Sequence, residues 1–114
     1  MHEYSIVASL IDKVAAEAGP RAARVHRLHV AIGELAGVDV PLLCTAFDTF
    51  CVDTVCAGAA LEVREVAAVW ACPGCGQTLE RGARLRCPCC DRPARLTRGD
   101  EIILERNEME VPDV

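Results

Sequence analysis

The chain of 114 residues contains eight cysteines and 52% hydrophobic residues, and its formal net charge is −5. This length suits one domain, or one domain with a small module, and no apolar run approaches the ~18–20 residues that span a bilayer. The start, Met-His-Glu-Tyr, lacks the basic beginning and apolar core of a signal peptide, so we expect a cytoplasmic protein whose thiols are free or bound to metal.

Two helices are predicted from apolar residues that recur at helical spacing. The first runs from Tyr4 to Ala18, and Gly19-Pro20 stops it. The second has Pro41 in its first turn and extends to about Val55. Its buried stripe is expected to comprise Leu42, Leu43, Ala46, Phe47, Phe50 and Cys51.

Three segments alternate apolar and polar residues as strands do: residues 24–33, 60–66 and 100–111. In the first of them, His26, Leu28, Val30 and Ile32 are expected on one face. The last segment is rich in acids and needs a sheet with which to pair. We therefore expect an α+β fold: a small antiparallel sheet of about three strands with two helices, and a cysteine-rich module inserted between two adjacent strands.

The charge is unevenly distributed along the chain. Residues 1–66 carry nine acids and five bases, residues 67–99 carry two acids and six arginines, and residues 100–114 carry six acids and one base. A basic module thus lies between two acidic segments. This pattern predicts one discontinuous α+β domain, residues 1–66 and 99–114, and a second domain, residues 67–98.

The basic module contains two C-x2-C pairs, Cys72 with Cys75 and Cys87 with Cys90, separated by eleven residues. Two such pairs facing each other supply the four thiolates that zinc prefers in structural sites. A disulfide or a redox C-x2-C would need only one pair. Cys89 adds a fifth thiol, so the fourth ligand is Cys90 by register, with Cys89 as an alternative.

The N-terminus offers a second set of donors. His2 is too large for removal of Met1, so the free α-amine, the His2 amide and the His2 imidazole can chelate one ion, with Glu3 as a fourth donor through its amide or its carboxylate. Nitrogen-rich tetragonal coordination suits Ni(II) or Cu(II). These donors lose protons on binding, so occupancy should fall in mild acid.

The remaining histidines and cysteines are expected to be structural. His26 and His29 lie three apart on a strand and should face opposite sides, so that they cannot share one metal; one should be half-buried and the other solvated. Cys44 and Cys51, seven apart on the second helix, are expected in the core, as is Cys56.

Other function classes receive weaker support. Six arginines on a zinc ribbon also fit a nucleic-acid-binding or regulatory module, although Trp70 is the only aromatic residue there for base stacking. A thiol oxidoreductase is a third possibility. No nucleophile–base pair, glycine-rich phosphate loop or carboxylate pair is recognisable, and a four-thiolate zinc has no open position, so we expect no enzyme activity.

Taken together, the motifs resemble the HypA/HybF family of hydrogenase-maturation nickel metallochaperones. The resemblance rests on M-H-E-Y-S-I at the start, I-G-E-L-A-G-V and F-D-T-F in the centre, L-E-V-R-E-V, and C-P-G-C-G with C-P-C-C in the module. It covers the whole chain in order and spacing.

The resemblance implies a nickel site at His2, with the Met1 amine and Glu3 beside it, and structural zinc on Cys72, Cys75, Cys87 and Cys90. It also implies delivery of nickel to the large subunit of a [NiFe]-hydrogenase, together with the GTPase HypB. In some organisms the family also serves urease, so urease maturation proteins are further possible partners.

Overall fold

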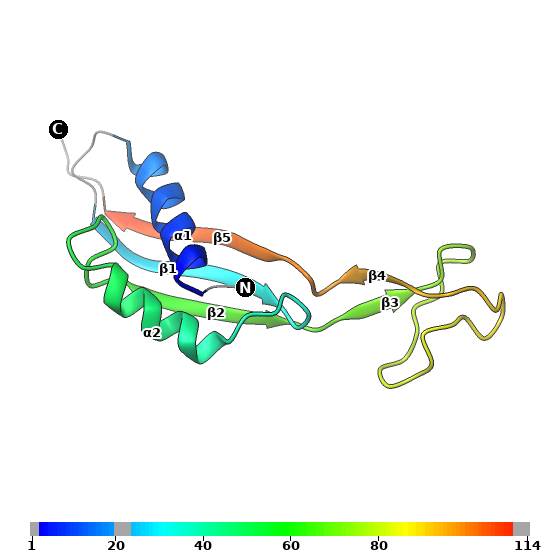
Figure 1. Ribbon diagram of the computed structural model, residues 1–114. Helices are drawn as coiled ribbons and strands as arrows, with labels where there is room; N and C mark the ends of the chain where they lie inside the picture. Colours follow the sequence, from blue (N-terminus) through cyan, green and yellow to red (C-terminus); the bar gives the residue numbers. More distant parts are fainter. Residues whose placement is uncertain (1–2, 20–23, 111–114) are drawn as a thin grey trace.

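The computed structural model describes residues 3–19 and 24–110, so Met1 and His2 lie outside the described residues. Its elements in chain order are α1 (Glu3–Ala18), β1 (Arg24–Gly33), α2 (Val40–Phe50), β2 (Ala60–Val66), β3 (Val69–Ala71), β4 (Arg95–Arg98) and β5 (Ile102–Glu110). The molecule measures 60 × 29 × 16 Å, with a helix-covered sheet at one end and a narrow arm at the other (Figure 1). Within these ranges, no helix combines the length and the apolar character needed to cross a membrane.

We call the sheet and its two helices the α+β unit, and residues 69–98 the ribbon. The core of the α+β unit lies between the helices and one face of the sheet (Figure 1). Leu28 and Val30 of β1 and Leu43 and Phe47 of α2 are fully buried there. Each such side chain contributes roughly 1.5–3 kcal/mol of burial free energy, and together they hold α2 against the sheet.

The predicted fold class, two helices with a three-stranded sheet and an inserted cysteine module, is confirmed, but the sheet is mixed. Its order is β2-β1-β5, and β1 pairs with β5 antiparallel but with β2 parallel. The cause is α2, which connects β1 to β2 and returns the chain to the same end of the sheet. The expectation that the module joins two adjacent strands is wrong, because β2 and β5 lie on opposite sides of β1.

An irregularity in the pairing of β1 with β5, between Val25 and Arg27, changes which side chains are buried. Val25 is only 1% exposed and joins Leu28 in the core, whereas His26 is exposed. An extra residue in one strand shifts the alternation by one position. The prediction that His26 shares a face with Leu28 is therefore wrong.

Helix α2 is shorter than predicted, ending at Phe50 instead of Val55. Turns follow it, and Asp53 (φ 64°), three residues after the end of the helix, adopts the left-handed conformation that prevents the helix from continuing. At its other end, Asp39 caps the helix because its carboxylate accepts a hydrogen bond of 3.0 Å from the Leu42 amide.

The ribbon is attached through two short connections, residues 67–68 and 99–101, which we call the neck. The end of β1 and the loop after it bond to the second connection: Gly33 N–H donates to Glu101 (2.8 Å) and Leu35 N–H donates to Gly99 (2.7 Å). Glu34 N–H donates to Val66, at the end of β2 just before the first connection (2.8 Å). A β-carbon on Gly33 would lie 2.2 Å from the Gly99 carbonyl, so this crossing requires glycine.

We predict that Asp39→Ala lowers the free energy of unfolding by about 1 kcal/mol, because the Leu42 amide loses its capping acceptor. Asp39→Ser should retain most of that stability. Asp48→Ala, on the exposed face of the same helix, is the matched control and should change stability by less than about 0.5 kcal/mol. Urea unfolding of each variant measures the difference, and equal effects of the two alanine variants would contradict the capping role.

Candidate metal centres

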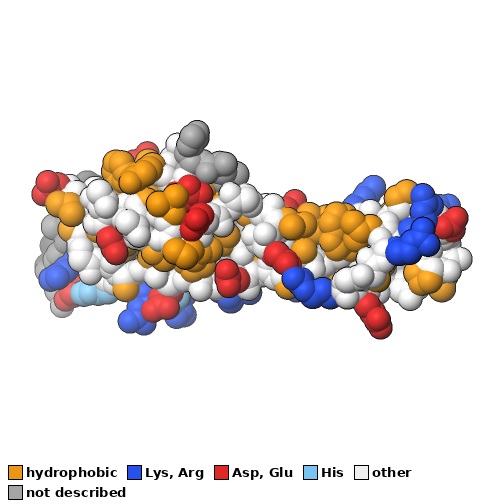
Figure 2. Space-filling model, turned by 60° about the horizontal axis from the view of Figure 1, so that its bottom comes forward, with side chains coloured by type: hydrophobic (Ala, Val, Ile, Leu, Met, Phe, Trp, Pro, Cys, Tyr) orange, Lys and Arg blue, Asp and Glu red, His pale blue; other side chains and the backbone are white. Residues whose placement is uncertain are grey.

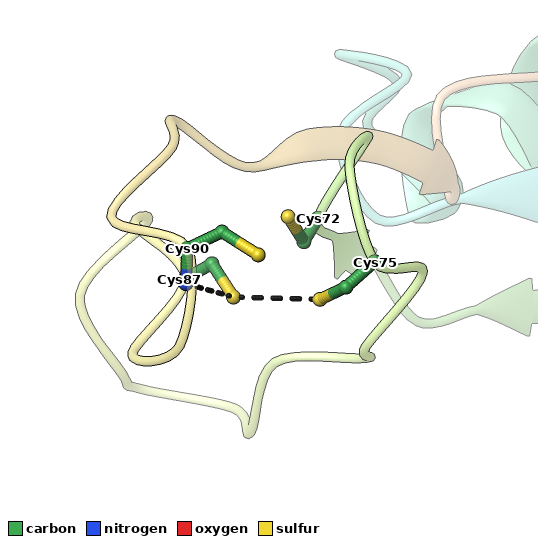
Figure 3. A group of neighbouring side chains, drawn as sticks. All are labelled: Cys72, Cys75, Cys87 and Cys90. Carbon is green, nitrogen blue, oxygen red and sulfur yellow. Dashed lines mark hydrogen bonds between the residues drawn. The ribbon is translucent and has the colours of Figure 1, made fainter.

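The ribbon brings four cysteine thiols together. The sulfur atoms of Cys72, Cys75, Cys87 and Cys90 all lie within 4.8 Å of one another, and those of Cys75 and Cys87 are 3.7 Å apart (Figure 3). A tetrahedral zinc ion with Zn–S bonds of about 2.3 Å would place its sulfurs about 3.8 Å apart. The four thiols therefore fit a tetrahedral zinc in number, chemistry and spacing.

Each C-x2-C pair is held by the same local backbone bonds. In the first pair, Cys72 N–H donates to Gln77 and Gly76 N–H donates to Cys72, both at 2.9 Å. In the second, Cys87 N–H donates to Arg92 and Asp91 N–H donates to Cys87, again at 2.9 Å. The residue after each pair, Gly76 or Asp91, has a positive φ, a conformation that these two residue types tolerate.

Because the two turns have the same geometry, they show which of Cys89 and Cys90 belongs to the four-thiol group. Cys90 occupies the position in the second turn that Cys75 occupies in the first, and its thiol points toward the other three (Figure 3). The exposed Cys89 thiol lies outside the group and donates a 3.4 Å hydrogen bond to the Gln77 side-chain oxygen. The structure thus brings together the four cysteines chosen by register.

The thiols of the group differ in acidity. Backbone N–H groups, first that of Cys75 and then that of Gly74, lower the pKa of Cys72 to about 6. A hydrogen bond with Cys75, together with desolvation, raises the pKa of Cys90 to about 12. Four thiolates at this spacing would repel one another, so full deprotonation of the group requires a bound cation, and binding must release protons.

Of the predicted N-terminal donors, only Glu3 lies within the described residues. It is the first residue of α1, and its carboxylate accepts a 3.2 Å hydrogen bond from the Asp39 amide, just before α2. In addition, the rings of Tyr4 and Phe50 meet edge to face with centroids 4.8 Å apart. The start of α1 is therefore tied to both ends of α2, contacts that the sequence pattern did not predict.

The prediction that His26 and His29 face opposite sides of the sheet is wrong. His26 Nε2 lies 3.1 Å from the Glu110 carboxylate and His29 Nε2 lies 2.7 Å from that of Glu108, two acids on the same outer face of β5. The shift after Val25 accounts for this. As expected, one histidine is more buried, with 22% side-chain exposure for His29 against 52% for His26. Neither belongs to a metal-binding group found among the described residues.

The other cysteines are largely structural. Cys51 and Cys56 are buried, as predicted, and burial raises the pKa of Cys56 to about 11, which disfavours a reactive thiolate. Cys44 is only half-buried, contrary to prediction. Cys51, the C-cap residue of α2, is the more buried of the two.

Basic side chains gather at the ribbon end of the molecule (Figure 2). Arg81 pairs with Glu34 across the neck, and Arg86 lies 3.6 Å from the Asp91 carboxylate. The other four ribbon arginines have no ion-pair partner within the described ranges. Trp70 is half-buried, and its backbone pairs with that of Leu96 across β3 and β4.

Comparisons with known proteins place the whole chain in one family. The family described as "Hydrogenase/urease nickel incorporation, metallochaperone, hypA" matches residues 1–109. The "Hydrogenase maturation factor HypA" of Shewanella sp. (strain MR-7) is 38% identical over 116 residues, covering 99% of this chain and 98% of that protein. The protein of the same name from Wolinella succinogenes is 37% identical, with coverage of 99% and 98%.

Solved structures agree with the sequence relatives. The solution structure of the Ni metallochaperone HypA from Helicobacter pylori has a TM-score of 0.69 and 31% identity, covering 96% of this chain and 97% of that one. A second solution structure of a HypA protein gives a TM-score of 0.74 at 31% identity and the same coverage. The four-cysteine ribbon, the fold and the relatives agree, and the chain belongs to the HypA family of metallochaperones for nickel incorporation into hydrogenase and urease.

Proposed function

We propose that this chain binds Ni(II) through Met1, His2 and Glu3 and delivers it to the large subunit of a [NiFe]-hydrogenase. The observation that carries the proposal is the anchoring of Glu3, whose carboxylate accepts the Asp39 amide at 3.2 Å where α1 begins. A chelate formed by the Met1 amine and the His2 imidazole would thus start directly on a helix packed against the core. Such anchoring lowers the entropic cost of ordering the donors.

Zn(II) is the second metal of the proposal, held by Cys72, Cys75, Cys87 and Cys90. Four thiolates form a closed tetrahedral shell with no open position, which suits a structural ion. Nickel on nitrogen donors at a chain end can be released by protonation or by a competing ligand. Donors of different softness and geometry keep each metal out of the other site.

The proposal includes the partners and the domain division. Nickel transfer involves the GTPase HypB and the hydrogenase large subunit, with urease maturation proteins as a further destination, in the cytoplasm and without catalysis by this chain. Residues 1–66 and 99–114 form the nickel domain, and residues 67–98 form the zinc domain. The division is supported by the two separate sheets, β2-β1-β5 and β3-β4.

His2→Ala should abolish tight nickel binding and leave zinc bound, because the imidazole is one of the chelating donors. A short N-terminal extension that moves the α-amine away from His2 should have the same effect. His26→Ala, which removes an exposed imidazole on the outer sheet face, is the matched control and should bind nickel normally. Calorimetric titration of untagged protein measures the affinity; unchanged affinity in His2→Ala would contradict the proposed site.

Glu3 should contribute its backbone nitrogen to nickel, because its carboxylate already accepts the Asp39 amide. Glu3→Gln keeps an acceptor for that amide and should bind nickel within about threefold of wild type, whereas Glu3→Ala should weaken binding about 10-fold or more, the usual effect of losing an outer-shell contact. Hydrogen exchange at the Asp39 amide should accelerate only in Glu3→Ala. Equal nickel losses in both variants would instead identify the carboxylate as a ligand.

Cys90→Ser should lower zinc retention under mild chelation, because one of the four thiolates is lost. Cys89→Ser is the matched control, since the Cys89 thiol lies outside the group and contacts Gln77. Zinc content after dialysis against a chelator distinguishes the two. Loss of zinc in Cys89→Ser with retention in Cys90→Ser would reverse the assignment.

A further inference from the structure

The loop that follows β1 joins the α+β unit to the ribbon through a side chain as well as through its backbone. One carboxylate oxygen of Glu34 accepts hydrogen bonds from the Ala68 amide in the neck and from Arg81 Nη1, both at 2.8 Å. The other oxygen accepts from Arg81 Nη2. Arg81 belongs to the ribbon loop between the two cysteine pairs and is 47 residues from Glu34 in sequence.

This arrangement is a bidentate, charge-assisted pair, which is the strong geometry for arginine and a carboxylate. The hydrogen bonds from Arg81, and next the one from Ala68, lower the pKa of Glu34 to about 2, so the carboxylate is ionised at any physiological pH. The Ala68 amide binds the same carboxylate, so Glu34 has a second contact that holds it in place beside Arg81. The two hydrogen bonds from Arg81 therefore fix the orientation of its guanidinium relative to the Glu34 carboxylate, in addition to the attraction between the opposite charges.

The neck on its own would allow the ribbon to turn. It consists of two short connections, and one of them contains Gly99, with φ 103°. Hydrogen bonds from residues 33 to 35 hold the neck close to the α+β unit but do not reach the body of the ribbon. The contact between Glu34 and Arg81 does reach it, beyond the neck, and so resists rotation about the two connections.

We propose that Glu34 is a positioning residue that fixes the direction of the ribbon relative to the α+β unit, by pairing with Arg81 across the neck. The pair makes the two halves one rigid body, so that a partner meets the start of α1 and the ribbon in a single constant arrangement. This role goes beyond metal binding and is independent of where nickel binds.

Backbone ¹⁵N relaxation of the zinc-loaded full chain tests the proposal. In the wild type, residues of β1, β2 and β5 should share one rotational correlation time with those of β3 and β4. In Arg81→Glu, where Glu34 is repelled, the ribbon should tumble separately with a shorter correlation time. Arg84→Glu is the matched control: it makes the same charge change three residues away at an exposed arginine with no ion-pair partner in the described ranges, and should leave one common time.

The double variant Glu34→Arg with Arg81→Glu restores opposite charges and should recover a common correlation time, a rescue that a merely space-filling role would not produce. Zinc content of each variant verifies that the ribbon remains folded. A common correlation time in Arg81→Glu, identical behaviour of Arg81→Glu and Arg84→Glu, or no recovery in the double variant would each overturn the proposal. No readout uses nickel, so failure here would leave the proposed nickel site untouched.

Discussion

Strand β1 forms backbone pairs with β2 on one side and β5 on the other, while its buried side chains contact both helices. Between Arg27 and Gly33 the strand has a neighbour on both edges, so most of its backbone hydrogen-bonding groups find partners there. The pairing fixes the position of the last residue of β2 and of the first residue of β5, and the ribbon is attached at these two points. The position of β1 thus determines both the core and the point from which the ribbon extends (Figure 1).

The two proposed metal sites differ in almost every physical respect. The ribbon holds four thiols at the spacing of a tetrahedral zinc, and two of them, Cys72 and Cys87, are buried. The proposed nickel donors are nitrogens at the chain end, followed at once by α1. A closed thiolate shell retains its ion, whereas terminal nitrogen donors that compete with protons can exchange theirs. Retention in one site and release from the other is the behaviour that a metallochaperone with a structural ion requires.

The two regions are connected through the neck. The close approach of Gly33 and Gly99 brings the loop after β1 against the chain segments that lead to the ribbon. Glu34, in that loop, reaches Arg81 on the ribbon itself. Gly33 is thus the last residue of β1 in the sheet, and the next residue, Glu34, contacts the ribbon. Under the proposed role of Glu34, the molecule of 60 Å would present both ends to a partner in one arrangement.

The sequence by itself determined the helices, the three long strands and the four-cysteine group, because these follow from local periodicity and from a fixed spacing of ligands. Tertiary structure alone decided the parallel pairing of β1 with β2, the shift that places His26 and His29 on one outer face, and the early end of α2. It also decided the contacts of Glu3 with Asp39 and of Glu34 with Arg81. Those contacts join residues 36 and 47 positions apart, and no local pattern records which distant residues the folded chain will bring together.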